Sequence, residues 1–167
     1  KACLSQHITT SSMVDVLKVA EDGTTLELVQ GVRIIPEGKD EGDFWADEVR
    51  LSRPTEGAPR FLYASTRGLN KDTLGYVAAF RLDDDGLIQG DALDIYETHT
   101  SGGIANAVEP APATESGPGV EYMALTDSQE GYVFILSFDG ARFKEAARTQ
   151  LIGEDGKPLA SATAVWL

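Results

Sequence analysis

The 167-residue sequence predicts an all-β fold, namely a β-propeller with about three four-stranded blades. Three observations lead to this fold class. Short apolar segments recur in families, the families share one common period along the chain, and acidic turns ending in glycine separate many of the segments. Regularly spaced short strands with turn signals are typical of propellers, in which each blade is a small antiparallel sheet.

The clearest family is an apolar strand followed by an acidic turn. In the middle copy the strand begins at Gly75 and the turn Asp83-Asp84-Asp85-Gly86 ends it. Glycine suits such turns because it adopts backbone angles that other residues resist. The three copies of this family are residues 12–23, 75–86 and 131–140.

Two further families repeat with the same spacing. One covers residues 60–67 and 120–127, with residues 2–5 as a weaker copy, and lies just before the acidic-turn family. The other covers residues 46–51, 105–110 and 162–167. In that family Val49, Val108 and Val165 follow one another at nearly equal intervals. Independent segments with one spacing indicate a structural repeat rather than chance similarity.

A fourth β-prone stretch follows each acidic turn, at residues 25–35, 87–96 and 142–152. The last of these is also compatible with a helix because it contains Lys144-Glu145-Ala146-Ala147. Its place in the repeat predicts a strand. Four short strands in each repeat unit define a propeller blade.

The order of the strands predicts the domain organisation, a single partial propeller over residues 1–167. The blade content is 1–44, 45–103 and 104–160, with a closing strand at 161–167 that should complete a blade whose other strands lie elsewhere. Natural rings have at least four blades, so the remaining blades, from the same precursor or another chain, are predicted partners. The alternative, an open β-sandwich with coincidentally similar strands, predicts no fixed period.

Composition excludes several function classes. The formal charge of −13 would repel phosphate backbones and anionic lipid, and no apolar run approaches a membrane span, so neither nucleic acid nor membrane is an expected partner. Cys3 is the only cysteine, and His7 and His99 are the only histidines. These counts allow no internal disulfide, no cysteine zinc cluster and no multi-histidine metal site.

Several motifs occur in the order found in one protein family. They are residues 62–68 (LYASTRG), 75–80 (GYVAAF), 100–103 (TSGG), 106–108 (NAV), 125–132 (LTDSQEGY) and 164–166 (AVW). With them the chain resembles the fungal 3-carboxy-cis,cis-muconate cyclases of the lactonase-type propeller superfamily. The likeness is good over residues 45–167 and loose over residues 1–44, which suggests the C-terminal part of such a protein.

The resemblance implies a seven-bladed ring that closes a tricarboxylic diene into a lactone without metal or organic cofactor. This intramolecular lyase chemistry needs cations for the carboxylates and a proton donor. Arg67 matches a family arginine of the central cleft and is the predicted catalytic residue. The family's histidine, glutamate and second arginine come from blades N-terminal to this segment, so the chain alone is expected to be inactive.

Loops 38–48, 97–106 and 127–131 should lie at the same end of the ring as Arg67. Arg67 could instead be a surface arginine paired with Asp72 or another loop carboxylate. His99 is either a proton donor or a solvated loop residue. Residues 101–103 predict a tight turn whose amides could hold a carboxylate. The predicted substrate-binding residues are His99, Ser101, Asn106, Asp127 and Glu130.

The predicted ligand is a small polycarboxylate or lactone, and two other functions remain open. One is hydrolysis of a sugar lactone, as in the 6-phosphogluconolactonase-like group. The other is a non-catalytic secreted fungal propeller antigen, which the acidic composition suits, although the sequence contains no N-x-S/T glycosylation sequon.

Overall fold

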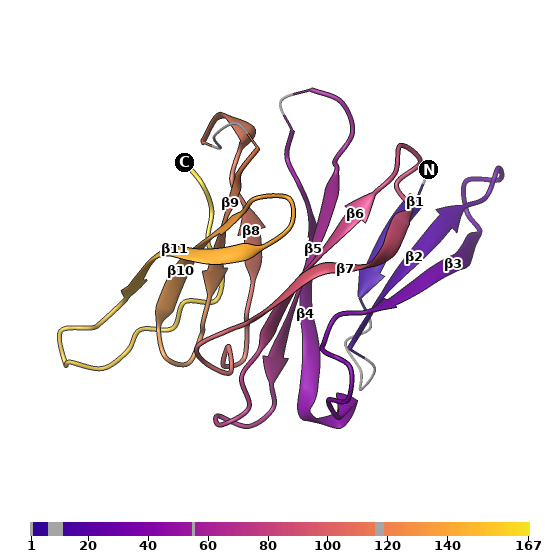
Figure 1. The fold of residues 1–167 in the computed structure, drawn as a ribbon. Coiled ribbons are helices and arrows are strands. Elements are labelled where there is room, and N and C mark those ends of the chain that lie inside the picture. Colours follow the sequence, from indigo (N-terminus) through magenta and orange to yellow (C-terminus); the bar gives the residue numbers. More distant parts are fainter. Residues whose placement is uncertain (1, 7–11, 55, 116–118) are drawn as a thin grey trace.

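The computed structural model describes residues 2–6, 12–54, 56–115 and 119–167, with side chains from residue 12 onward. Three antiparallel sheets stand side by side like the leaves of a fan (Figure 1). The first sheet consists of β1 (Ala2–Gln6), β2 (Met13–Val19) and β3 (Leu26–Arg33). The middle sheet consists of β4 (Phe44–Leu51), β5 (Phe61–Gly68), β6 (Tyr76–Leu82) and β7 (Ile88–Glu97). The last sheet consists of β8 (Val108–Pro110), β9 (Glu121–Thr126), β10 (Tyr132–Phe138) and β11 (Phe143–Gln150).

The strand order confirms the predicted blade pattern. In the middle and last sheets each strand pairs with the next along the chain, and the first sheet has the second to fourth strands of the repeat. The 142–152 segment, whose helical alternative remained open, forms strand β11. Two short 3₁₀ turns, Glu41–Asp43 and Ala113–Glu115, lie in the connections. No helix among the described residues is long and apolar enough to cross a membrane.

The two junctions between sheets have different cores. Aliphatic side chains dominate between the first and middle sheets, with Val14, Val16 and Leu62 fully buried. Aromatic rings dominate between the middle and last sheets, where Phe138 lies 5.2 Å from Phe61 and 4.8 Å from Phe143 between ring centroids. Edge-to-face and tilted rings at these separations attract one another beyond their buried area.

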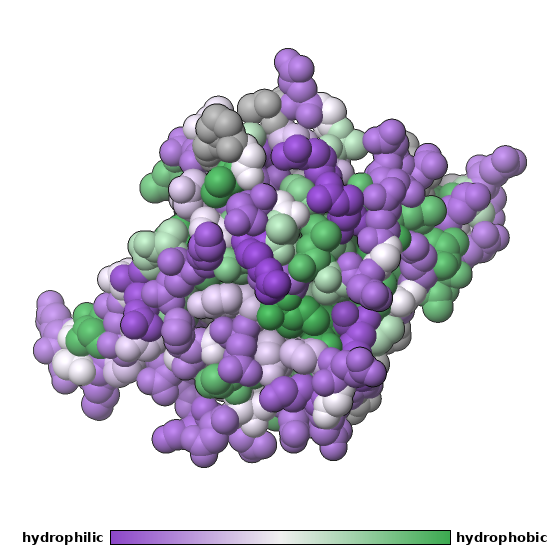
Figure 2. All heavy atoms as spheres, in the orientation of Figure 1, coloured by the Kyte–Doolittle hydropathy of each residue, from purple (hydrophilic) through white to green (hydrophobic). Residues whose placement is uncertain are grey.

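Burial follows the position of each strand in the fan. All residues of β5 are buried except one, because sheets cover both of its faces. Strand β3 has no buried residue in its pattern and leaves Leu26, Leu28 and Val29 exposed. The visible face in Figure 2 is mostly hydrophilic, with apolar side chains gathered in patches.

The predicted closing segment, residues 161–167, has no strand pairing in this structure. It nevertheless lies along the last sheet. The Trp166 indole donates to the Glu109 carbonyl at 2.9 Å, and the Thr126 hydroxyl donates to the Ala162 carbonyl at 3.1 Å. A strand requires a partner edge, so completion of a blade elsewhere stays a prediction.

Candidate functional site

Three loops meet at the end of the fan where β4 begins and β5 ends (Figure 1). They are the 38–43 loop that leads into β4, the 98–106 loop and the 127–131 loop, which lie within the ranges expected from the sequence. Backbone hydrogen bonds hold them together. These are Gly68 N to Ser101 O at 2.9 Å, Leu69 N to Asp43 O at 2.9 Å, and Ser128 N to Gly102 O at 3.3 Å.

Arg67 lies within this loop cluster with only 12% of its side chain exposed. Its Nη1 donates to the Gly103 carbonyl at 3.0 Å, and its Nε is 3.4 Å from Asp47 Oδ1. Its guanidinium carbon is 4.4 Å from the ring centroid of Trp45, a cation–π distance. Both Asp47 and Trp45 belong to β4, the first strand of the blade. Arg67 therefore points toward the first strand, and its carboxylate partner is Asp47 rather than Asp72. The pair is mostly buried, so the expected alternative holds for a neighbouring carboxylate but not for a surface position.

Asp47 is the extra residue of a β-bulge. The pairing of β4 with β5 passes from Ala46 directly to Glu48, so Asp47 has no opposite residue. Bulges turn side chains out of the regular alternation and recur near functional sites. Here the bulge directs the carboxylate toward two neighbours. Its Oδ1 lies close to Arg67, and its Oδ2 accepts a hydrogen bond from the backbone amide of Asn106 at 2.8 Å.

Burial changes the acidity of Asp47. It raises the pKa of this carboxyl to about 6, although the hydrogen bond from the Asn106 amide and the charge of Arg67 oppose the increase. The neighbouring Glu48 carboxylate adds slightly to it. Asp47 therefore changes its charge near neutral pH, unlike an ordinary aspartate.

Asn106 is almost wholly buried beside this pair. Its side-chain amide donates to the Thr66 backbone carbonyl at 2.8 Å, and its backbone carbonyl accepts the Ser65 hydroxyl at 2.6 Å. These bonds clamp the loop before β8 onto β5. The structure thus gives Asn106 a structural part, while direct contact with substrate stays a prediction.

Ser101, Gly102 and Gly103 form the tight turn expected from the sequence. Both glycines have positive φ, at 88° and 69°. A Cβ at Gly103 would lie 2.5 Å from the backbone nitrogen of Gln129, so only glycine fits there. The Ser101 hydroxyl accepts the Gly103 amide at 3.3 Å, which leaves the Gly103 carbonyl turned toward Arg67.

Asp127 and Glu130 occupy the neighbouring turn. Asp127 is fully buried, and its Oδ1 accepts the amides of Gln129 at 2.7 Å and Glu130 at 2.8 Å. Its Oδ2 has no hydrogen-bond partner among the described residues. The Ser128 hydroxyl accepts amides of the 97–106 loop, so this turn contacts the same loop as Arg67. A role in substrate binding for either acid stays a prediction.

His99 has its contacts elsewhere. Its Nε2 is 2.8 Å from Glu145 Oε2, and its ring stacks on Phe134 at 6.1 Å between centroids. Glu145 is on β11, the last strand of its sheet, whereas Arg67 contacts the first strand of the middle sheet. The structure therefore does not bring His99 into the Arg67 cluster, and a proton-donor role is left without geometric support.

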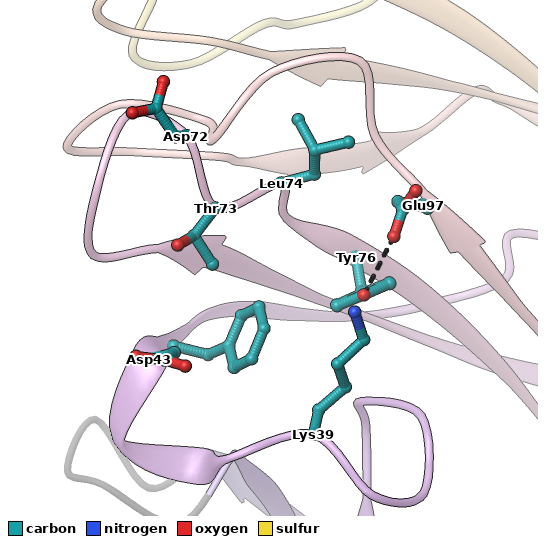
Figure 3. Close-up of a pocket in the computed structure, with 8 residues that line it drawn as sticks. Lys39, Asp43, Asp72, Thr73, Leu74, Tyr76 and Glu97 are labelled. Carbon is teal, nitrogen blue, oxygen red and sulfur yellow. Dashed lines mark hydrogen bonds between the residues drawn. The ribbon is translucent and has the colours of Figure 1, made fainter.

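A separate hollow of about 350 Å³ lies between the 36–44 and 69–75 loops (Figure 3). The Tyr76 hydroxyl donates to Glu97 Oε2 at 3.0 Å, and Lys39 Nζ is 5.9 Å from the Tyr76 ring centroid. Its lining has three carboxylates, Asp43, Asp72 and Glu97, against one ammonium. Such a lining disfavours a polyanion, so Arg67 is the better anion site.

Sequence reasoning missed Trp45 and Asp47. The signal was present, because residues 46–51 were recognised as a repeated strand in which a polar residue follows the first alanine. The bulge that aims this polar residue has no signature in the repeat. Among the described residues, no group of three His, Cys, Asp or Glu side chains is arranged as metal ligands.

Comparison with solved structures supports the fold. A Bacteroides fragilis protein assigned as a 6-phosphogluconolactonase superposes with a TM-score of 0.60 over 90% of this chain and 35% of its own, at 17% identity. At that identity the likeness concerns the fold alone. The chain thus has an all-β, lactonase-type propeller fold.

Two sequence relatives extend the comparison beyond the fold. Muconate cycloisomerase 1 of Cutaneotrichosporon cutaneum is 38% identical over 98% of this chain. Carboxy-cis,cis-muconate cyclase of Neurospora crassa is 36% identical over 55% of it. The matches cover 42% and 24% of those proteins, and no family model matches. These findings confirm the resemblance to the carboxy-cis,cis-muconate cyclases that is seen in the sequence.

Proposed function

We propose that this chain supplies the Arg67 site of a cofactor-free, lactonising isomerase that acts on carboxy-cis,cis-muconate or a similar polycarboxylate. The observation that supports this is the buried guanidinium itself. Asp47, Trp45 and the Gly103 carbonyl fix its plane at the inner strand of the blade. A fixed arginine suits planar carboxylates because its paired N–H groups match their geometry.

The reaction explains why one fixed cation matters. A carboxylate oxygen of the substrate forms a C–O bond to an alkene carbon, and the π electron pair moves to the adjacent carbon. That carbon then takes up one proton, and nothing leaves. Negative charge moves during the step, and a preorganised donor such as Arg67 stabilises it without reorganisation.

The activity of the whole protein requires more than this chain. The chain spans 42% of the first relative, and β3 at one side of the fan exposes Leu26, Leu28 and Val29. We propose that the remaining blades, from the same precursor or another chain, cover such faces and bring the other charged groups to the cleft. Apolar sheet faces of this kind favour further protein contact.

Hydrolysis of a sugar lactone is the second candidate, because the B. fragilis protein that shares this fold is assigned as a 6-phosphogluconolactonase. The two reactions differ in what is bound. A muconate presents two or three carboxylates on a planar diene, whereas a sugar lactone is a hydroxylated ring. The exposed ring of Trp45 beside Arg67 fits a planar conjugated anion better, which favours the first candidate.

The test is kinetic and uses the natural full-length protein. Arg67→Ala should lower kcat/KM for carboxymuconate cyclisation about 30- to 1,000-fold, which corresponds to about 2–4 kcal/mol of transition-state binding. The loss of diene absorbance measures turnover. Arg142→Ala is the matched control, because Arg142 is 75% exposed and pairs with Asp94 at 3.5 Å.

Equal turnover in both variants would remove Arg67 from the mechanism. Arg67-dependent opening of a sugar lactone, without cyclisation, would favour the second candidate. If the protein does neither, the non-catalytic propeller is the better account.

A further inference from the structure

Asp47 is placed to respond to whatever binds Arg67. Its Oδ1 is 3.4 Å from Arg67 Nε, only 15% of its side chain is exposed, and its Oδ2 accepts the Asn106 amide. The Asp47 carboxylate is thus the counter-charge that Arg67 already has before any anion arrives. An incoming carboxylate must share the guanidinium with it.

We propose that binding of a carboxylate at Arg67 draws a proton onto Asp47, so that the site takes up anion and proton together. This inference rests on the proposed function and adds to it the source of one proton. Two carboxylates around one guanidinium repel each other, and neutralising one relieves the repulsion.

The groups around Asp47 support this coupling. Arg67 from β5 and Glu48, its neighbour on β4, are the charged groups with the largest influence on the pKa of Asp47 among the described residues. From the loop before β8 comes the uncharged Asn106, while Glu109 on β8 pairs with Arg50 and Arg53. Strand β1 also packs on β4, and its side chains lie outside the described part.

Asp47 also starts close to the point of protonation. Burial raises the pKa of Asp47 to about 6, so an added negative charge nearby need shift the balance only slightly at neutral pH. An aspartate with an ordinary pKa would stay ionised after the same perturbation. The backbone bulge that isolates Asp47 from the ladder is what creates this environment.

The coupling matches the proton balance of lactonisation. The reaction forms one C–O bond and one C–H bond and consumes one proton. Substrate binding would then bring that proton to a carboxyl group 3.4 Å from the guanidinium that holds the substrate. Asp47 would return to its carboxylate form when the proton is used, and solvent would supply the next proton.

The experiment is calorimetric titration of the full-length protein with trans,trans-muconate. This planar dienedioate is fully ionised at pH 7 and cannot close to a lactone, because each carboxylate points away from the alkene carbon it would attack. Measuring the heat in buffers of different ionisation enthalpy gives the number of protons taken up. At pH 7 we expect about 0.4–0.8 proton per bound anion.

Two variants sharpen the measurement. Asp47→Asn should bind the anion with almost no proton uptake, and with an affinity that changes little between pH 6 and 8. Glu48→Gln, at the next residue, is the matched control and should keep the uptake. Because Asp47→Asn could unfold, infrared difference spectra of the unmodified protein with ¹³C-labelled aspartate supply a second readout, namely a protonated carboxyl band on binding.

The outcomes separate this inference from the proposed function. Binding that depends on Arg67 but takes up no proton, or takes up the same number in Asp47→Asn, would overturn the coupling and leave the anion site standing. A missing infrared band would do the same. If no binding depends on Arg67, both proposals fail.

Discussion

The middle and last sheets contain the same repeat. They nevertheless carry different charges at the end where the loops around Arg67 meet. Arg67 is the last residue but one of β5, the second strand in the middle sheet. At the matching position of the last sheet, Asp127 directly follows β9. Asp47 lies near the start of β4, the first strand of the middle sheet. Asn106 occupies the matching position of the repeat, just before β8. The positions correspond in the repeat, although Asp47 lies at a bulge within β4 and Asn106 lies in the loop before β8.

The two ends use their side chains differently. Arg67 reaches across strands to Asp47, Trp45 and the Gly103 carbonyl. Asp127 turns back on its own loop and caps two backbone amides. One end thus holds a cation at the inner strand and the other end stabilises a turn. The repeat can therefore keep its fold while the ends of its blades carry different charges.

Gly103 connects the two ends, and its replacement should have the largest effect on stability. Its φ is +69°, and an added Cβ would lie 2.5 Å from the Gln129 backbone nitrogen. Gly103→Ala should lower the free energy of unfolding by about 3 kcal/mol, from strain at positive φ and from a clash with backbone that cannot move aside. Urea unfolding of the full-length protein measures it.

The matched control is Gly90→Ala. Gly90 has a similar φ of +71°, and no atom lies within 4 Å of the position that an added Cβ would take. This substitution should cost only about 1 kcal/mol, the part due to backbone conformation. Similar losses in the two variants would show that the contact between the loops contributes nothing.

Asp47→Asn makes the middle sheet resemble the last one, and its effect should depend on pH. The pKa of Asp47 is raised from 3.8 in the unfolded reference to about 6 by burial. An acid whose pKa is raised in the folded protein stabilises the fold while it is protonated. The contribution of Asp47 to the free energy of unfolding is therefore complete below about pH 4 and is lost as pH rises through 6. The full loss should be about 3 kcal/mol.

The measurement is the free energy of unfolding of both proteins from pH 4 to pH 7. The difference between natural protein and Asp47→Asn should favour the natural protein most at pH 4 and decrease toward pH 7. A difference that stays constant over this range would contradict the altered acidity of Asp47.

Much of the fold could be predicted from the sequence, because it depends on periodicity. The spacing of Val49 and Val108 placed β4 and β8, and the acidic turns placed β6 and β10. Position in the repeat also predicted a strand where the local composition is compatible with a helix, and this strand is β11, residues 143–150. Residues 161–167 show the limit of this reasoning, since strand pairing depends on an edge that the segment itself does not contain.

The site could be predicted only in part. Arg67 was found through the family resemblance, and the glycine turn through its backbone requirements. Asp47 was missed because a bulge shifts it out of the two-residue alternation on which strand prediction depends. Trp45 pairs with Arg67 in regular register, but it lies just before the repeated segment 46–51. His99 was placed by loop membership alone, and a long loop spans both the inner and outer edges of a sheet.

Asp127 offers the last and smallest test of the comparison. Its Oδ1 accepts two backbone amides, while its buried Oδ2 has no partner among the described residues. Asp127→Ala removes the acceptor for both amides and should lower the free energy of unfolding by about 1–2 kcal/mol. Asp127→Asn retains one oxygen for the two amides and should change stability by less than about 0.5 kcal/mol.

If Asp127 only stabilises its turn, both variants should also bind trans,trans-muconate with the affinity of the natural protein. A tenfold change in affinity for Asp127→Asn, with unfolding unaffected, would instead place this carboxylate in the anion site beside Arg67, and the two ends of the repeat would then share one function.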